Sequence, residues 1–267
     1  MTKPKALILA GDGVNCEEET QYAFKVAGAE ADIVHNRDLI AGRKSLDEYQ
    51  ILTLPGGFSF GDDTGSGNGL ANRLRNNLWD ALTTFVEQDK LVLGICNGFQ
   101  VLVRLGLVPA LEGQYGGQQV ALIHNDGAQY IDRWVDLRCS SKSPWLRNIQ
   151  QLSLPIAHGE GKLYAPAETL KQMQQKELIA ARYTFGKMCA YQSSLPVNPN
   201  GSLDDIAALT DESGRILGMM PHPERAIAFT HLPDWALQKE KMKRREEPLP
   251  KEGPGLQVFK NGVAYFS

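Results

Sequence analysis

A cysteine between an apolar run and a helix-period pattern is the strongest chemical signal in the chain. Leu91 to Ile95 form an apolar run with the length and branching of a buried parallel strand. Gly94, Cys96 and Gly98 follow in the spacing of the Gly-x-Ser-x-Gly elbow, with a thiol in place of the hydroxyl. A helix N-terminus favours thiolate. Cys96 is therefore a candidate nucleophile, and the alternative is a small buried cysteine that only packs.

A histidine and a carboxylate much later in the chain complete a possible catalytic group. A short apolar segment ends at a loop that contains His222 and Glu224, with Pro221 and Pro223 on either side of the histidine. A cysteine thiol is only partly ionised at neutral pH and needs a base beside it, which a carboxylate-oriented histidine supplies. Alone, this pair would be interpreted as a surface histidine and a solvated glutamate in a proline-rich turn. Together with the cysteine elbow, it predicts a Cys-His-Glu triad.

Two backbone N–H groups are candidates for stabilising an oxyanion. The apolar segment Ile51 to Leu54 leads directly into Gly56 and Gly57. Acyl transfer needs donors aimed at the developing negative charge. The N–H groups of Gly57 and Asn97 fit that role, whereas the alternative is a plain glycine turn that ends a strand.

These segments resemble a known family. The motifs Pro-Gly-Gly-Phe-Ser-Phe-Gly-Asp, Gly-Ile-Cys-Asn-Gly-Phe-Gln and Pro-His-Pro-Glu-Arg, in this order, are similar to those of class I, triad-type glutamine amidotransferases. Ala-His-Gly-Glu-Gly, ending at Gly161, points to the glutaminase subunits of phosphoribosylformylglycinamidine synthase, an enzyme of purine biosynthesis. The resemblance covers residues 5–228 and resumes in the last segment.

The resemblance implies a reaction and partners. Cys96 would attack the carboxamide of L-glutamine, and His222 with Glu224 would assist release of ammonia and hydrolysis of the thioester. Phe99 and Gln100 look like the glutamine-contacting positions of the family. His158 would lie near glutamine or the ammonia exit, or would be a hydrogen-bonded loop histidine.

The resemblance also implies that ammonia passes to a separate synthetase subunit, and it leaves open whether a small third subunit joins the complex. This chain would hold no cofactor or metal, and ATP and magnesium would belong to the synthetase. A segment from Asn125 to Arg133 would line the same pocket. The protein would be cytoplasmic.

Composition agrees with a cytoplasmic enzyme. The 267 residues are 42% hydrophobic, which is enough for one large core. A net charge of −3 makes nucleic acid an unexpected partner, and the absence of a long apolar run argues against a membrane span. The four cysteines form no Cys-x-x-Cys pair, so we expect reduced thiols rather than disulfides or a zinc site.

Alternating patterns predict an α/β fold. Strands are expected at 5–10, 31–35, 51–54 and 217–220, with helices at 16–27 and 70–88 and a closing helix within 255–266. This order predicts a mostly parallel sheet flanked by helices, and residues 120–208 are expected to form shorter strands and loops. The resemblance implies a flavodoxin-like fold with a smaller antiparallel portion. Asn15 and Glu18 have the spacing of a helix cap and its partner. Sites in such sheets lie at the carboxyl ends of strands, where Gly57 and Cys96 are expected.

Three further features are open to more than one interpretation. The glycine-rich segment 61–69 lacks the pattern of a phosphate-binding loop and is interpreted as a flexible loop beside the active site. Cys16 lies between a strand and a helix but is expected to be a helix-start residue, because no His-x-Glu remains to serve it. Residues 228–254 form a charged insertion in a single domain of residues 1–267, either a solvated helix and linker or a docking arm for the synthetase.

Other functions fit the same motifs. The chain could supply ammonia to another acceptor, or it could be a protease-like hydrolase of the same superfamily. That protease branch typically has a histidine directly after its nucleophile, whereas Asn97 follows Cys96 here. A catalytically silent regulatory subunit is the remaining alternative, and the intact triad argues against it.

Overall fold

The computed structural model describes residues 3–140, 142–192 and 194–267. Within them, the strands are β1 (Lys5–Ala10), β2 (Glu30–His35), β3 (Ile51–Leu54), β4 (Leu91–Ile95), β5 (Ala121–Ile123), β6 (Ile131–Cys139), β7 (Gln151–His158), β8 (Lys162–Tyr164), β9 (Ile179–Thr184), β10 (Ile206–Thr210) and β11 (Ile216–Met219). The α-helices are α1 (Glu17–Ala27), α2 (Asn36–Ile40), α3 (Asn68–Glu87), α4 (Asn97–Leu105), α5 (Ala167–Gln175), α6 (Lys187–Tyr191), α7 (Trp235–Arg244) and α8 (Leu256–Ala264).

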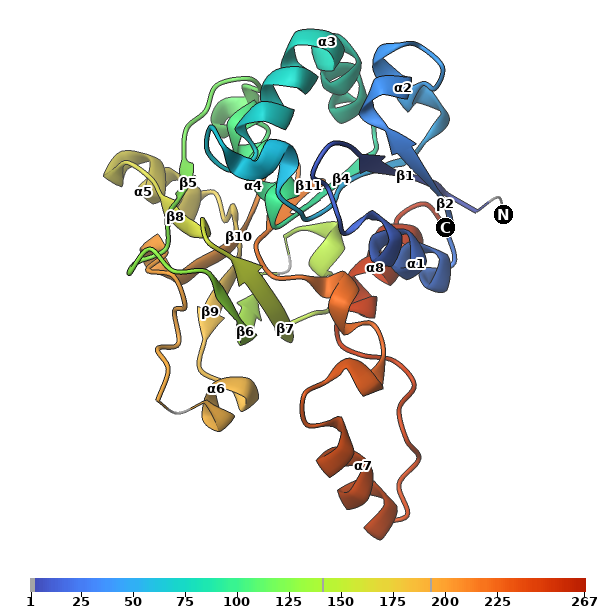
Figure 1. Cartoon of the computed structure of the whole chain (residues 1–267), viewed down its shortest axis with the longest axis vertical. Helices are drawn as coiled ribbons and strands as arrows, with labels where there is room; N and C mark the ends of the chain where they lie inside the picture. Colours follow the sequence, from blue (N-terminus) through green and yellow to red (C-terminus); the bar gives the residue numbers. More distant parts are fainter. Residues whose placement is uncertain (1–2, 141, 193) are drawn as a thin grey trace.

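One large mixed sheet organises the chain (Figure 1). Its described strands lie in the order β2-β1-β3-β4-β11-β10-β9-β6-β7. The first five are mutually parallel, and the remaining contacts, from β11 to β7, are antiparallel. The predicted α/β fold with a parallel sheet and an antiparallel portion is confirmed. The antiparallel strands extend the same sheet, and β5 pairs with β8 separately.

The central parallel strands β3, β4 and β11 are nearly continuous apolar runs because helices cover them. Every residue of β3, β4 and β11 is buried, as expected for strands with both faces covered. Helix α1 packs on α8, where the rings of Phe24 and Phe259 meet edge to face with centroids 4.9 Å apart. Helices α3 and α4 pack on each other as a second helical pair. This packing fixes the strand ends that bear the candidate site.

The element boundaries agree with the sequence patterns to within two residues for most elements, but the predicted cap of α1 is wrong. Cys16, not Asn15, is the N-cap residue, and its side chain makes no capping hydrogen bond. The backbone N–H groups of Asn15 and Cys16 both donate to the Gly56 carbonyl oxygen, each at 3.2 Å. The start of α1 is therefore set by contact with the loop after β3 rather than by a local cap.

Residues 228–254 leave the body of the protein as an arm that contains α7 (Figure 1). The two ends of the arm pair at its base, where Ala228 bridges Glu252 and the N–H of Gly253 donates to the Ile227 carbonyl oxygen at 2.9 Å. Helix α7 buries none of its residues. Across the described parts of the chain, no helix is long and apolar enough to cross a bilayer.

Candidate active site

The turn between β4 and α4 places Cys96 in a conformation that few residues adopt. Cys96 has φ 50° and ψ −106°, which costs an L-residue about 1–3 kcal/mol and is typical of functional turns. The two flanking glycines are needed for close backbone approach. A Cβ at Gly98 would lie 1.8 Å from the Leu54 carbonyl oxygen, and one at Gly94 would lie 2.8 Å from the Gly98 carbonyl oxygen. The predicted nucleophile elbow is present.

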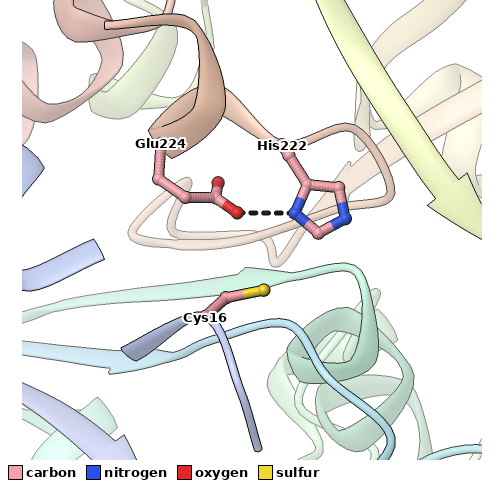
Figure 2. A group of neighbouring side chains, drawn as sticks. All are labelled: Cys16, His222 and Glu224. Carbon is pink, nitrogen blue, oxygen red and sulfur yellow. Dashed lines mark hydrogen bonds and ion pairs between the residues drawn. The ribbon is translucent and has the colours of Figure 1, made fainter. Parts of the chain in front are cut away.

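Sheet order brings the histidine to the cysteine. Strands β4 and β11 are parallel neighbours with Ile95 beside Met219, so Cys96 and His222 leave the same edge of the sheet. The His222 N–H donates to the Pro155 carbonyl oxygen at 2.8 Å, which fixes the loop. His222 Nδ1 lies 2.5 Å from Glu224 Oε1, and both side chains are buried (Figure 2). The structure therefore brings together all three predicted triad members.

The groups around His222 raise the pKa of its imidazole, so the ring stays protonated to a higher pH than usual. Burial lowers the pKa of His222, but the Glu224 carboxylate and the neighbouring sulfur atoms of Cys96 and Cys16 outweigh that effect and raise the pKa well above its ordinary value. Nε2, on the opposite side of the ring from Glu224, has no hydrogen-bond partner among the described residues. This nitrogen is suited to exchange a proton with a sulfur atom or a substrate.

The candidate oxyanion donors lie beside the nucleophile. Gly57 has φ 149° and lines a cavity of about 200 Å³ together with Cys96. Asn97 is the first residue of α4, where backbone N–H groups have no partner within the helix. The Asn97 side chain accepts a hydrogen bond from the Ser59 N–H at 3.2 Å, so it ties the elbow to the loop after β3. Both predicted donors occupy positions compatible with the role.

Cys16 is closer to the catalytic group than the sequence indicated. Its sulfur accepts a hydrogen bond from Arg225 Nη2 at 3.0 Å and lies beside His222 (Figure 2). Cys16 and Cys96 both line a cavity of about 160 Å³. His222 therefore faces both thiols, while Cys16 begins helix α1 as the predicted helix-start residue. Burial raises the pKa of the Cys16 thiol, which disfavours its thiolate.

Cys16, His222 and Glu224 also lie within the spacing of metal ligands, with candidate donor atoms all within 4.8 Å of one another. Two contacts argue for a hydrogen-bonded cluster instead. The Arg225 guanidinium lies against the Cys16 sulfur, and a second cation there would be repelled. His222 Nδ1 is already paired with Glu224. Each described cysteine is a free thiol, as predicted.

Of the two predicted glutamine-contacting residues, Phe99 and Gln100, only Gln100 lines the larger cavity. Gln100 and His158 line it with Cys96. Gln100 Nε2 donates to the Glu160 carbonyl oxygen at 2.6 Å, and Gln100 Oε1 accepts from Asn97 Nδ2 at 2.9 Å. Phe99 lies elsewhere: its ring packs against Gly218 of β11, where a Cβ would come within 2.1 Å of it. The structure places Phe99 in the core beneath the elbow and not among the residues that line the cavity.

Only part of the segment from Asn125 to Arg133 lines the larger cavity. Gln129 and Tyr130 line the larger cavity. Asn125 instead organises the loop, with Nδ2 donating to the carbonyl oxygens of Gln129 and His158 at 2.9 and 2.8 Å. The Arg133 guanidinium reaches the Pro196 carbonyl oxygen. Only the middle of this segment therefore faces the candidate substrate.

Several residues that line the two cavities were not predicted individually as site residues. Asp62, Ser66 and Glu160 line the larger cavity, and Arg225 lines the smaller one. Asp62 and Ser66 belong to the glycine-rich segment that the sequence places beside the active site, and this position is confirmed. A signal for Glu160 was available in the Ala-His-Gly-Glu-Gly motif, but nothing in the sequence indicated which way its side chain points.

The comparisons with known proteins agree with this geometry. A model of the CobB/CobQ-like glutamine amidotransferase domain matches residues 3–266. The chain belongs to this family. It is 45% identical to the phosphoribosylformylglycinamidine synthase subunit PurQ of Methanococcus maripaludis, over 99% of this chain and 98% of that protein. It is 40% identical to the subunit of the same name from Dehalococcoides mccartyi, over 99% and 98% of the two chains.

A solved structure extends the likeness to three dimensions. The structure of PurLQS from Thermotoga maritima matches with a TM-score of 0.72 and 27% identity, covering 100% of both chains. A glutamine amidotransferase from Thermotoga maritima matches with a TM-score of 0.51 and 13% identity, covering 99% of this chain and 96% of that one. The second likeness shows a shared fold alone.

Proposed function

We propose that this protein is the glutamine-hydrolysing subunit of phosphoribosylformylglycinamidine synthase. The observation that carries the proposal is the strained Cys96 elbow beside the buried His222–Glu224 pair, at one edge of a sheet and open to one cavity. The family of the chain and its PurQ relatives support the choice of glutamine as substrate and of purine biosynthesis as the pathway. The enzyme is a glutamine amidotransferase.

In the first step, the Cys96 thiolate attacks the side-chain carbonyl carbon of L-glutamine. His222 receives the thiol proton at Nε2, and Glu224 stabilises the imidazolium through Nδ1. The N–H groups of Gly57 and Asn97 stabilise the oxyanion of the tetrahedral intermediate. Because these donors belong to the backbone at two strand ends, they are held in place before substrate binds.

In the second step, the intermediate collapses to a γ-glutamyl thioester on Cys96. The His222 imidazolium protonates the departing nitrogen, and ammonia leaves. Neutral His222 then takes a proton from water, whose oxygen attacks the thioester carbon and releases glutamate. Water and glutamine are consumed, glutamate and ammonia are formed, and the thiol and imidazole are regenerated.

Ammonia then passes to a partner. We propose that a separate synthetase subunit uses ATP and magnesium to activate formylglycinamide ribonucleotide and that this chain holds neither cofactor. A small third subunit is a further expected member of the complex, whereas nucleic acid and membranes are not expected partners. The name of the Thermotoga maritima structure supports an assembly of several subunits. A cytoplasmic location fits a reaction that needs a reduced Cys96.

The test is glutamate release from L-glutamine by the full chain, with and without the synthetase subunit, formylglycinamide ribonucleotide and ATP. We expect weak release by the chain alone and a strong increase with the complete partner mixture. Release that does not respond to the partner would contradict the purine assignment and favour another acceptor. Binding to the partner without any release would favour a silent regulatory subunit.

A further inference from the structure

Cys16 is a buried nucleophilic group that the thioester mechanism does not use. The residue is 1% exposed, and its sulfur points toward His222 (Figure 2). Cys96 lies beside the same imidazole. The other two cysteines, Cys139 and Cys189, line neither of the two cavities that contain Cys96. Among the described residues, Cys16 is thus the one further thiol at the active site.

The space between the two thiols is bordered by a residue without a side chain. A Cβ on Gly56 would lie 3.0 Å from the Cys16 sulfur and 3.5 Å from Cys96 Cβ, so the two cysteines flank the space of one methyl group. Both also line the cavity of about 160 Å³, together with Gly57 and His222. The two side chains therefore border one shared open space.

The sheet holds the two cysteines on either side of Gly56. Strand β3 lies between β1 and β4, and Cys16, Gly56 and Cys96 follow these three strands in turn. Leu54 pairs with Gly94, so Gly56 and Cys96 leave the sheet side by side. From the other side, the Cys16 N–H donates to the Gly56 carbonyl oxygen at 3.2 Å. The approach of the two thiols is therefore a property of the backbone.

Cys16 is the partner that can move and react. Residues 11–16 form a turn and an isolated bridge rather than a helix or a strand, whereas Cys96 is held in the elbow. The Cys16 sulfur is held by two polar contacts, with Arg225 Nη2 at 3.0 Å and Asn15 Oδ1 at 3.2 Å. A guanidinium beside a thiol stabilises the thiolate that forms as the sulfur attacks.

A small oxidant has access to Cys96. The residue lines the cavity of about 200 Å³ that is proposed to admit glutamine, and a peroxide is much smaller than glutamine. Thiolates beside a cation are the form of cysteine that peroxide oxidises to sulfenic acid, and a second thiol nearby converts the sulfenic acid to a disulfide. The imidazole of His222 supplies the cation, and Cys16 supplies the second thiol.

We propose that Cys16 and Cys96 form a reversible oxidation site, at which a peroxide converts the two thiols to a disulfide and stops glutamine hydrolysis. This inference goes beyond the proposed function and uses it only as one of two readouts. A Cys96 bound in a disulfide has no thiolate to attack the carboxamide. The disulfide also protects Cys96 from further oxidation to the sulfinic acid, which dithiol reductants do not reverse.

One imidazole serves both steps of the oxidation. The Cys96 thiolate attacks a peroxide oxygen: an S–O bond forms, the O–O bond breaks, and the departing hydroxide takes the proton of the His222 imidazolium and leaves as water. Neutral His222 then removes the Cys16 thiol proton, and the Cys16 thiolate attacks the Cys96 sulfur. The S–S bond forms, the S–O bond breaks, and hydroxide takes the proton back from His222 as a second water. Each sulfur loses one electron, and the peroxide gains two.

Peptide mapping tests the bond directly. The full chain is treated with hydrogen peroxide, catalase removes the excess, free thiols are blocked with N-ethylmaleimide, and the sample is digested with trypsin without reductant. Trypsin leaves Cys16 on the peptide of residues 6–25 and Cys96 on the peptide of residues 91–104. We expect a disulfide-linked species of these two peptides that dithiothreitol separates. Its absence, or a disulfide from Cys96 to any other cysteine, would overturn the proposal.

Recovery of activity tests the role of Cys16. The wild type, Cys16→Ser and the control Cys139→Ser are oxidised, incubated with dithiothreitol and assayed for glutamate release with untreated synthetase partner. Cys139 ends β6 and lines neither cavity. We expect the wild type and Cys139→Ser to recover at least about tenfold more activity than Cys16→Ser, because Cys96 without its partner thiol is oxidised to the sulfinic acid. Equal recovery in all three would overturn the proposal.

The two readouts separate the oxidation site from the proposed function. Linked peptides in a chain that releases no glutamate, before or after reduction, would keep the oxidation site and overturn the glutaminase function. Glutamate release that peroxide leaves unchanged, with no linked peptides, would keep the glutaminase function and overturn the oxidation site. The peptide map of the wild type stands whether or not the Cys16→Ser variant folds.

Discussion

Two cysteines face one histidine in this protein, and only one of them is placed for catalysis. Cys16 and Cys96 each lie at the N-terminus of a helix that follows a parallel strand, and each sulfur lies beside His222. Helix dipole and histidine are therefore common to both and cannot explain the difference. The distinction lies in backbone geometry and in access to the larger cavity.

The backbone of Cys96 is strained, whereas that of Cys16 is not. Cys96 has positive φ, between two glycines that allow strand and helix to approach closely. Cys16 has φ −109°, and its sulfur is held by Arg225 and by Asn15 Oδ1 at 3.2 Å. Cys96 lines the cavity with the acidic groups, and Cys16 lines only the smaller one. Exposure of the sulfur to substrate, not proximity to a base, separates the nucleophile from its neighbour.

The largest expected effect comes from removing each thiol in turn. Cys96→Ala should lower glutamate release at least about 10³-fold, because loss of a nucleophile removes the covalent pathway. The matched variant Cys16→Ala should retain release within about threefold. Steady-state kinetics with the synthetase complex measures both, and a larger loss in Cys16→Ala than in Cys96→Ala would reverse the comparison.

Removing the carboxylate that orients His222 should have the next largest effect. Glu224→Gln should lower kcat by about 10²-fold or more, because the imidazolium loses its buried counter-charge. Glu19→Gln is the control on the Cys16 side, since Glu19 pairs with Arg225 at 3.4 Å on the protein surface. Comparable losses in the two variants would show that the ion pair beside Cys16 matters as much as the triad.

The pH dependence of alkylation should separate the two sulfur atoms. The raised pKa of His222 keeps an imidazolium beside Cys96 at neutral pH, and this imidazolium is lost as the pH rises through the raised pKa. The raised pKa of Cys16 keeps that residue as a thiol until the pH is alkaline. Iodoacetamide at pH 7 should therefore label Cys96 at least about tenfold faster than Cys16, with the ratio falling toward pH 10. Peptide mass spectrometry measures it, and a ratio near one at pH 7 would contradict the account.

The smallest expected effect is that of Cys16→Ser. A hydroxyl can keep the contacts with Arg225 and Asn15, so stability should change by less than about 1 kcal/mol and kcat by less than about threefold. Urea unfolding and steady-state kinetics test this. A loss of kcat at unchanged stability would show that the sulfur itself tunes His222.

Local sequence patterns predict the nucleophile elbow, the triad residues and the strands that position them. The elbow follows from an apolar run and glycine spacing, and the triad from a His-x-Glu in a loop after a buried strand. Parallel neighbours β3, β4 and β11 then bring Gly57, Cys96 and His222 to one edge. The resemblance places Phe99 against the substrate, but the helical period that buries α4 directs its ring to Gly218.

The features of the site that the sequence did not predict depend on contacts between segments far apart in the chain. The proximity of Cys16 to His222 arises where the start of α1 hydrogen-bonds to Gly56. Asp62 meets Glu160 because Ser66 bridges the loop after β3 and the end of β7, 94 residues later in the chain. No periodicity or short motif encodes such pairings.

The most direct test of the central assignment is to trap the thioester. The complete complex is mixed with L-glutamine, quenched in acid within one turnover, and digested for peptide mass spectrometry. The account predicts a γ-glutamyl adduct on the peptide that contains Cys96 and none on the peptide that contains Cys16. An adduct on Cys16, or glutamate release with no adduct on either cysteine, would contradict it.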